Sequence, residues 1–160
     1  MKKVIIKSLV CFVLIIVTIN VNAQNFSDGA KLTAEFPSTN PAENVSKLND
    51  KNLSTKFCIR NISTMWFQYE LTSAAIVTKY AISSANDMPE RDPKGWILQA
   101  SNDGFKWKDL DVKKDEKFTG RRETKTYDVI NDVTYKFYRI RITESNGASF
   151  LQLSEWHLIK

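Results

Sequence analysis

Histidine, cysteine and glycine-rich motifs are scarce in this sequence, and their scarcity excludes several classes of catalytic site. A Ser-His-Asp triad or a histidine-rich zinc site would have to be built on the single histidine, His157. We find no nucleophile–base pair, no zinc-ligand spacing and no glycine-rich phosphate loop. Two carboxylates such as Asp87 and Asp92 could serve a glycosidase on paper, but the sequence favours a protein that is not an enzyme.

The N-terminal segment has the pattern of a secretory signal. Three lysines precede an almost unbroken apolar run over residues 9–19, and a small-residue site ends at Ala23. This pattern predicts cleavage near Ala23, and the alternative is a retained membrane anchor. We therefore expect a signal peptide at residues 1–23 and one domain at residues 24–160. Such a protein is exported to the periplasm, the cell surface or the medium.

The mature chain has little net charge of either sign. The full sequence has 23 Lys and Arg residues against 18 Asp and Glu residues, a formal net charge of +5. Three of the basic residues belong to the signal, which leaves 20 against 18 and a net charge of only +2. The remaining basic pairs, such as Arg121-Arg122, are interleaved with acidic residues, as on a solvated mixed-charge loop. The sequence therefore gives no indication of a nucleic-acid partner.

Cys58 is the only cysteine after the signal, so the mature chain cannot form an internal disulfide. About 137 residues suit one domain with a substantial core, and stability must come from packing, with a metal ion as a further contributor. Cys58 lies between Phe57 and Ile59, which predicts a small buried side chain rather than a reactive thiol.

Short alternations of apolar and polar residues predict an all-β domain. In the segment 96–100, Trp96, Leu98 and Ala100 share one face, and the turn Asn102-Asp103-Gly104 then leads into a returning strand. Tyr135–Thr143 is the strongest strand pattern, with Tyr138, Ile140 and Ile142 on one face. We expect further strands near residues 31–36, 67–71, 76–84, 124–129 and 150–159. Strands at intervals of roughly ten residues, without an amphipathic helix, favour a β-sandwich.

An ordered set of motifs resembles the factor 5/8 type C, or discoidin-like, domain. The central motifs are Asn86-Asp87, Arg91-Asp92-Pro93, Trp96, Ser101-Asn102-Asp103-Gly104 and Trp107, and the closing ones are Tyr138-Arg139-Ile140-Arg141-Ile142 and Gln152-Leu153-Ser154-Glu155. The resemblance covers residues 44–160. It implies the galactose-binding-like fold, a jelly-roll β-sandwich of about eight antiparallel strands. Many animal members carry a disulfide between the domain ends, which this chain cannot form. That departure favours the bacterial carbohydrate-binding modules of family 32.

The resemblance also implies a structural calcium ion. In similar modules a loop and a glutamate of the last strand bind calcium, and the matching residues here are Asp50, Asn52, Thr55 and Glu155. Their carboxylate, amide and hydroxyl oxygens suit calcium. The alternative is a loop stabilised by its own Asx turns, with Glu155 exposed.

Glycan binding in similar modules uses loops at one end of the sandwich. Such a site needs an aromatic face for a pyranose ring and planar polar groups for its hydroxyls. The matching residues are Asn86, Asp87, Arg91, Asp92, Arg121, Arg122, Asn146 and Phe150. As alternatives, Arg91 and Asp92 could form an internal salt bridge, and Phe150 could belong to the core.

The resemblance therefore predicts an exported, non-catalytic module that binds glycans or glycoconjugates through these loops. The alternative is a protein-interaction or adhesion module of the cell surface that uses the same loops. Membrane insertion is not favoured, because the loops offer few apolar side chains: Met88, Phe118 and Phe150.

Overall fold

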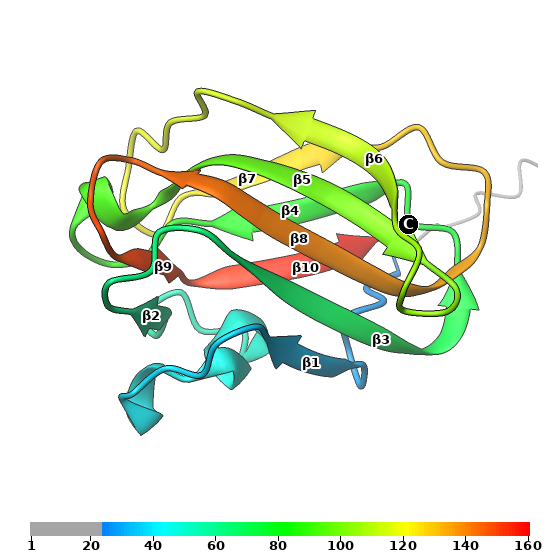
Figure 1. Ribbon diagram of the computed structural model, residues 1–160, viewed down its shortest axis with the longest axis horizontal. Helices are drawn as coiled ribbons and strands as arrows, with labels where there is room; N and C mark the ends of the chain where they lie inside the picture. Colours follow the sequence, from blue (N-terminus) through cyan, green and yellow to red (C-terminus); the bar gives the residue numbers. More distant parts are fainter. Residues whose placement is uncertain (1–23) are drawn as a thin grey trace, which may run out of the picture.

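The computed structural model describes residues 24–160, in which the predicted alternation forms ten strands joined by loops (Figure 1). The strands are β1 (Lys31–Ala34), β2 (Phe57–Ile59), β3 (Met65–Ala75), β4 (Lys79–Ser83), β5 (Pro93–Ser101), β6 (Lys108–Lys113), β7 (Thr124–Asp128), β8 (Tyr135–Ser145), β9 (Leu151–Leu153) and β10 (Glu155–Ile159). Three short 3₁₀ helices occur in the loops: η1 (Pro41–Glu43), η2 (Val45–Asn49) and η3 (Pro89–Arg91). The predicted signal peptide, residues 1–23, lies outside the described residues.

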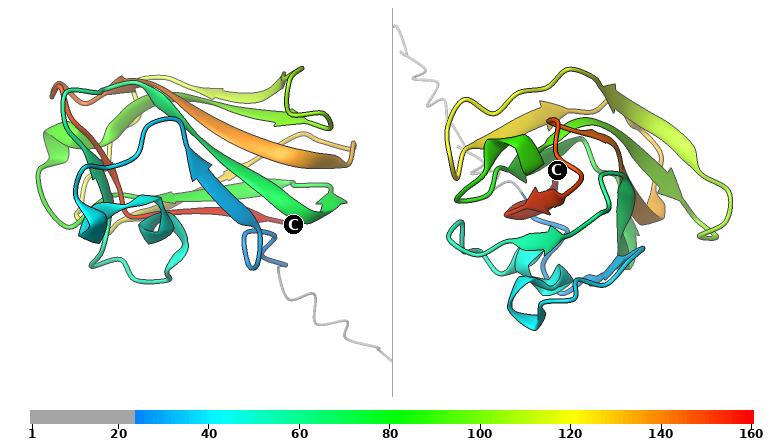
Figure 2. Two further views of the ribbon diagram at one scale, coloured as in Figure 1. Left: turned by 60° about the horizontal axis from the view of Figure 1, so that its bottom comes forward. Right: turned by 60° about the vertical axis from the view of Figure 1, so that its left-hand side comes forward.

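The strands form two facing layers (Figure 2). One is a five-stranded sheet in the order β1-β3-β8-β5-β6, and the other is a three-stranded sheet in the order β10-β4-β7. A two-stranded ladder, β2-β9, completes the fold, and every strand pairing is antiparallel. The predicted all-β jelly-roll sandwich is thereby confirmed.

The core lies between the layers and is built from the faces that the alternation predicts. Trp96 and Leu98 of β5 are fully buried, as are Tyr138 and Ile140 of β8. The neighbouring residues of both strands point to the opposite side of the five-stranded sheet, as expected from the two-residue repeat of a strand. Cys58 is also buried, as predicted.

The end of the chain differs from the single strand predicted for residues 150–159. Ser154 interrupts it, since its amide donates to the Ser83 carbonyl at 3.0 Å and its hydroxyl donates to the Thr55 carbonyl at 2.8 Å. The result is two strands, β9 and β10, which belong to different sheets. The partner of β9 is β2, which has only three residues, all buried, and therefore carries no alternation that a sequence pattern could reveal.

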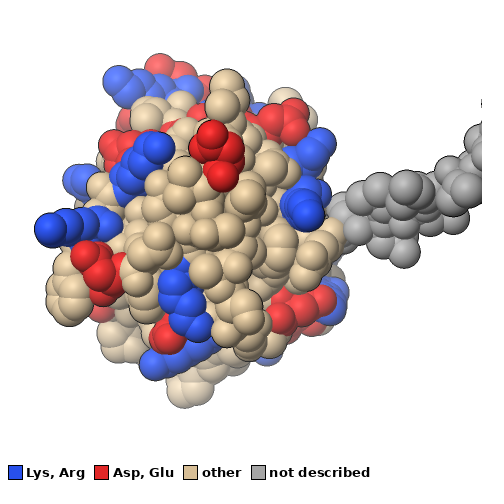
Figure 3. Space-filling view, turned by 90° about the vertical axis from the view of Figure 1, so that its right-hand side faces the viewer, with Lys and Arg blue, Asp and Glu red and all other residues tan. Residues whose placement is uncertain are grey.

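The two ends of the described chain meet at one end of the sandwich, where the Lys160 amide donates to the Gln24 carbonyl at 3.0 Å. This end is uncharged over much of its surface, with charged side chains mainly around its margin (Figure 3). Within residues 24–160, no helix is long and apolar enough to cross a membrane. The loops implicated by the resemblance lie at the opposite end (Figure 1).

The buried hydroxyl of Tyr80 joins the two layers, and its removal gives a test of the core. The Trp96 indole N–H donates to Tyr80 Oη at 2.9 Å, and Tyr80 donates in turn to Asp111 Oδ2 at 2.7 Å. We expect Tyr80→Phe to lower the free energy of unfolding by about 1–3 kcal/mol, because two polar groups lose a buried partner. Urea denaturation measures the loss. The control is Tyr127→Phe, whose hydroxyl contacts Glu116 at a partly exposed position; equal losses in both variants would contradict the account.

Candidate functional site

Four segments meet at the end of the sandwich remote from the termini: residues 50–56, 84–92, 114–123 and 145–150 (Figure 2). Backbone hydrogen bonds tie these loops to one another. The Arg122 amide donates to the Ala85 carbonyl at 3.1 Å, and the Asn146 amide donates to the Asp92 carbonyl at 2.8 Å. The loop end is therefore a fixed surface, although it contains little regular secondary structure.

Asp92 lies beneath this surface and holds three of the loops together. Its carboxylate is 3% exposed and forms a two-point ion pair with the Arg121 guanidinium, which also donates to the Asp87 carbonyl at 2.8 Å. The Gln152 amide donates to the carbonyls of Asp87 and Met88 at 2.8 and 2.9 Å. Burial raises the pKa of Asp92 above its ordinary value, although Arg121 and Gln152 favour its charged form.

This arrangement bears on two expectations, the salt bridge between Arg91 and Asp92 and the ligand contacts of Asp92 and Arg121. An internal salt bridge does brace the loop, but the partner of Asp92 is Arg121 and not its neighbour Arg91. Asp92 and Arg121 were both predicted to contact ligand, yet their charged groups are engaged with each other and one of them is buried. Their charged groups therefore brace the loops from within.

Arg91 and Phe150 lie together on the outer side of the loops. The guanidinium of Arg91 lies 4.7 Å from the centre of the Phe150 ring, and that of Arg60 lies 5.8 Å from it. Phe150 is half-buried and does not belong to the hydrophobic core. Asn146 is tied to η3 through its side-chain amide, which donates to the Pro89 carbonyl at 3.2 Å. Arg122 is exposed.

The loop end also contains a polar cleft of about 340 Å³, which is lined by Ala42, Glu43, Ser54, Thr55, Lys56, Asn86 and Asp87. Lys56 is the central cation, since its ammonium lies 2.5 Å from Asp87 Oδ1 and 3.9 Å from Glu43 Oε1. Asn86 Oδ1 is buried and accepts no hydrogen bond from the part of the chain that the structure describes. The predicted residues Asn86 and Asp87 thus share a cleft with two charged residues, Lys56 and Glu43, that the sequence did not indicate.

Cys58 lies under this cluster. Its thiol is 8% exposed, and burial is the main cause that raises its pKa, with the charge of Glu43 adding to the effect. A raised pKa disfavours the reactive thiolate. The cleft is therefore suited to binding through charged and polar groups rather than to thiol chemistry.

The four predicted calcium ligands are brought together at the edge of the loop end. The backbone N–H of Asn52 donates to both carboxylates, to Asp50 Oδ1 at 3.1 Å and to Glu155 Oε1 at 2.9 Å. The Thr55 hydroxyl donates to Asp50 Oδ2 at 2.7 Å. Partial burial alone would raise the pKa of Asp50, but hydrogen bonds from Thr55 and Lys47 hold it below its ordinary value.

Glu155 differs from the alternative expectation that it is simply exposed. It is 2% exposed, and its Oε2 atom accepts no hydrogen bond among the described residues. His157 Nε2 lies 3.0 Å from this oxygen, which is an ion pair only if the imidazole is protonated. Two adjacent carboxylates, one of them with an oxygen that accepts no hydrogen bond within residues 24–160, fit a hard cation. No group of three or more His, Cys, Asp and Glu side chains suited to a metal occurs in residues 24–160, so amide, hydroxyl and carbonyl oxygens would have to complete the ligand set.

The buried ion pair between Asp92 and Arg121 predicts that replacing Arg121 destabilises the protein strongly. Replacing its neighbour Arg122 should have little effect on stability. Arg121→Ala leaves the Asp92 carboxylate buried without its charged partner, which we expect to lower the free energy of unfolding by about 2–4 kcal/mol. Arg122→Ala removes an exposed side chain and should change it by less than about 0.5 kcal/mol. Thermal and urea denaturation of both variants measure these changes. Equal losses of stability in Arg121→Ala and Arg122→Ala would contradict the supporting role of the Asp92–Arg121 pair.

The comparison with solved structures finds the same fold in carbohydrate-binding modules. The family 32 module of NanJ from Clostridium perfringens, solved in complex with galactose, has a TM-score of 0.71 at 13% identity, covering 87% of this chain and 100% of that one. The F5/8 type C domain of a Bacteroides fragilis protein has a TM-score of 0.71 at 10% identity, covering 88% of this chain and 97% of that one. Identities this low show a shared fold.

A curated relative is similar over a shorter stretch. The peptide-N(4)-(N-acetyl-beta-glucosaminyl)asparagine amidase of Arabidopsis thaliana is 37% identical over 86 residues, which cover 51% of this chain and 12% of the plant protein. The chain therefore spans about an eighth of that relative. The model of the F5/8 type C domain family matches residues 31–156, from β1 into β10. This match includes both sheets and all four loops of the candidate site, and the chain belongs to the F5/8 type C domain family.

Proposed function

We propose that this domain is an exported, non-catalytic module that binds glycans at the loop end of the sandwich. The observation that carries the proposal is that the loop end holds both a polar cleft, with Lys56, Asn86 and Asp87 in its lining, and the half-buried ring of Phe150. Sugar recognition requires such a combination of an aromatic face and planar polar groups. The solved complex of a structural neighbour with galactose supports the same class of ligand.

The residues of the loop end divide into two roles under this proposal. Lys56, Asn86 and Asp87 offer donors and acceptors to adjacent hydroxyls, while Phe150 offers the aromatic surface of its ring. The guanidinium of Arg91 stacks on the Phe150 ring, and its N–H groups can donate to a sugar hydroxyl while this stacking contact is kept. Asp92 and Arg121 fix the positions of these groups from behind, because binding sites depend on supporting hydrogen bonds.

We further propose that calcium stabilises the loop end without contacting the glycan. Asp50, Asn52, Thr55 and Glu155 would hold the ion, with the carbonyl of Lys47 or Leu48 as a further ligand. When bound, calcium supplies a charge that offsets the repulsion between the two carboxylates. Because Asp50 precedes β2 and Glu155 begins β10, these residues link the start of the domain to its last strand, as a disulfide would.

Calcium should therefore raise the melting temperature of the purified protein by about 5–10 °C over the protein in chelator. Asp50→Ala should abolish this rise, because it removes one of the two carboxylates. The matched control is Asp128→Ala, which removes an exposed carboxylate on β7 and should leave the rise intact. An identical melting temperature with calcium and with chelator would contradict the calcium proposal.

A glycan array tests the binding proposal directly. Phe150→Ala and Arg91→Ala should each weaken binding to the best glycan by about tenfold or more, since they remove the aromatic face or its guanidinium. Phe105→Ala removes an equally large aromatic side chain, 88% exposed, from the β5–β6 loop and should change affinity by less than about twofold.

The array also separates the two classes of partner. The glycan proposal would be refuted if the protein bound no glycan in the presence of calcium. If the protein then captured a cell-surface protein, and Phe150→Ala abolished that capture, the result would support an adhesion role for the same loops.

A further inference from the structure

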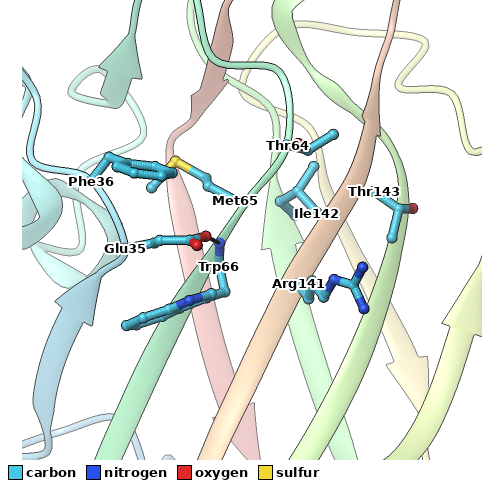
Figure 4. Close-up of a pocket in the computed structure, with 8 residues that line it drawn as sticks. All are labelled: Glu35, Phe36, Thr64, Met65, Trp66, Arg141, Ile142 and Thr143. Carbon is cyan, nitrogen blue, oxygen red and sulfur yellow. Dashed lines mark hydrogen bonds between the residues drawn. The ribbon is translucent and has the colours of Figure 1, made fainter.

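The outer face of the five-stranded sheet carries a second hollow (Figure 4). Its volume is about 400 Å³, within the usual range for ligand pockets. Its lining comes from β3 and the residue before it, from β8 and from the segment after β1, and includes Glu35, Phe36, Thr64, Trp66, Arg141 and Thr143. The hollow shares no lining residue with the loop cleft.

The register of the sheet places an aromatic residue and a cation side by side on this face. Trp66 of β3 pairs with Arg141 of β8, while their neighbours Phe67 and Ile140 point into the core. Directly opposed residues of antiparallel strands have Cβ atoms about 5 Å apart. The indole then extends toward β1 and the guanidinium toward β5 (Figure 4), so the hollow has an aromatic side and a cationic side.

The cationic side is not neutralised by the protein. Among residues 24–160, Arg141 has no carboxylate within ion-pair distance. Arg139 lies two residues away on the same face but does not line the hollow, because its guanidinium stacks 4.0 Å from the centre of the Trp107 ring and is held by Gln99 Oε1, at 3.0 Å from Nε and 2.8 Å from Nη2. Burial and the neighbouring charge of Arg141 lower the pKa of Arg139. A guanidinium without an internal carboxylate partner, such as that of Arg141, favours an anionic group.

The opposite side of the hollow favours neutral hydroxyls. Glu35 Oε2 accepts a hydrogen bond from the Trp66 amide at 3.1 Å, which fixes the carboxylate beside the indole. A second anion placed there would be repelled, whereas sugar hydroxyls could donate to the carboxylate. The hollow is therefore polarised, with an acceptor and an aromatic face at one side and a fork of donors at the other.

We propose that this hollow is a second binding site, specific for acidic saccharides of the oligouronide class. The ring of one uronic acid unit lies on the Trp66 indole with its hydroxyl edge toward Glu35. Its carboxylate, at the opposite edge of the ring, points away from Glu35 and forms a two-point pair with Arg141. This site is independent of the loop cleft, and each can bind its ligand without the other.

Titration calorimetry of the purified protein with tetragalacturonate tests the proposal. Trp66→Ala and Arg141→Ala should each weaken binding by about tenfold or more, whereas Phe150→Ala in the loop cleft should leave the affinity within about twofold. Trp66→Phe and Arg141→Lys are the conservative variants. Trp66→Phe keeps an aromatic face and should retain most of the affinity, while Arg141→Lys keeps the charge, loses the fork of donors and should have an intermediate affinity.

The fully methyl-esterified tetramer serves as the matched ligand control. It has the same rings without the charge and should bind about tenfold more weakly or not at all. Circular dichroism and melting of each variant separate lost binding from lost folding, and Trp66→Phe replaces Trp66→Ala if the latter unfolds. Absence of binding to tetragalacturonate, or equal binding of the ester, would overturn the proposal. So would a loss of affinity in Phe150→Ala but not in Arg141→Ala, which would place the acidic ligand in the loop cleft.

Discussion

The loop end of the domain depends on one buried ion pair, that between Asp92 and Arg121. A buried carboxylate must be paired, because its desolvation costs several kcal/mol. Arg121 satisfies it and also holds the backbone of the preceding loop through the Asp87 carbonyl. Gln152 then joins the same carbonyl to β9. Asn86 and Arg91 are proposed to contact the ligand. The loop that carries them is therefore held in place by Asp92 and Arg121, whose charges pair with each other.

Much of the fold could be predicted from the sequence, because a strand covered on one side repeats every two residues. The inward faces of β5 and β8 follow directly from this alternation, and the turn at Gly104 has the positive φ that its glycine indicates. The pattern fails where a strand is too short to alternate. β2 has three buried residues and β9 has three more, and their pairing depends on contacts between residues about a hundred positions apart.

The candidate site was predictable only in part, for a similar reason. The resemblance indicated the loops and the residue types, but sequence proximity suggested Arg91 as the partner of Asp92, whereas the fold supplies Arg121 from 29 residues away. Lys56 gives no signal in the sequence. It becomes central to the cleft because the fold places it against Asp87. The same holds for Trp66 and Arg141, whose pairing is a property of strand register.

The most direct test of glycan binding at the loop end is amide chemical-shift mapping of the isotopically labelled protein in calcium. The ligand is the glycan that gives the strongest array signal. The account predicts that the perturbed amides cluster in residues 54–60, 85–92 and 146–150, with the outer face of the five-stranded sheet unchanged by a neutral sugar. Perturbations confined to the loops at residues 102–107 and 129–134, at the opposite end of the sandwich, would contradict the central claim.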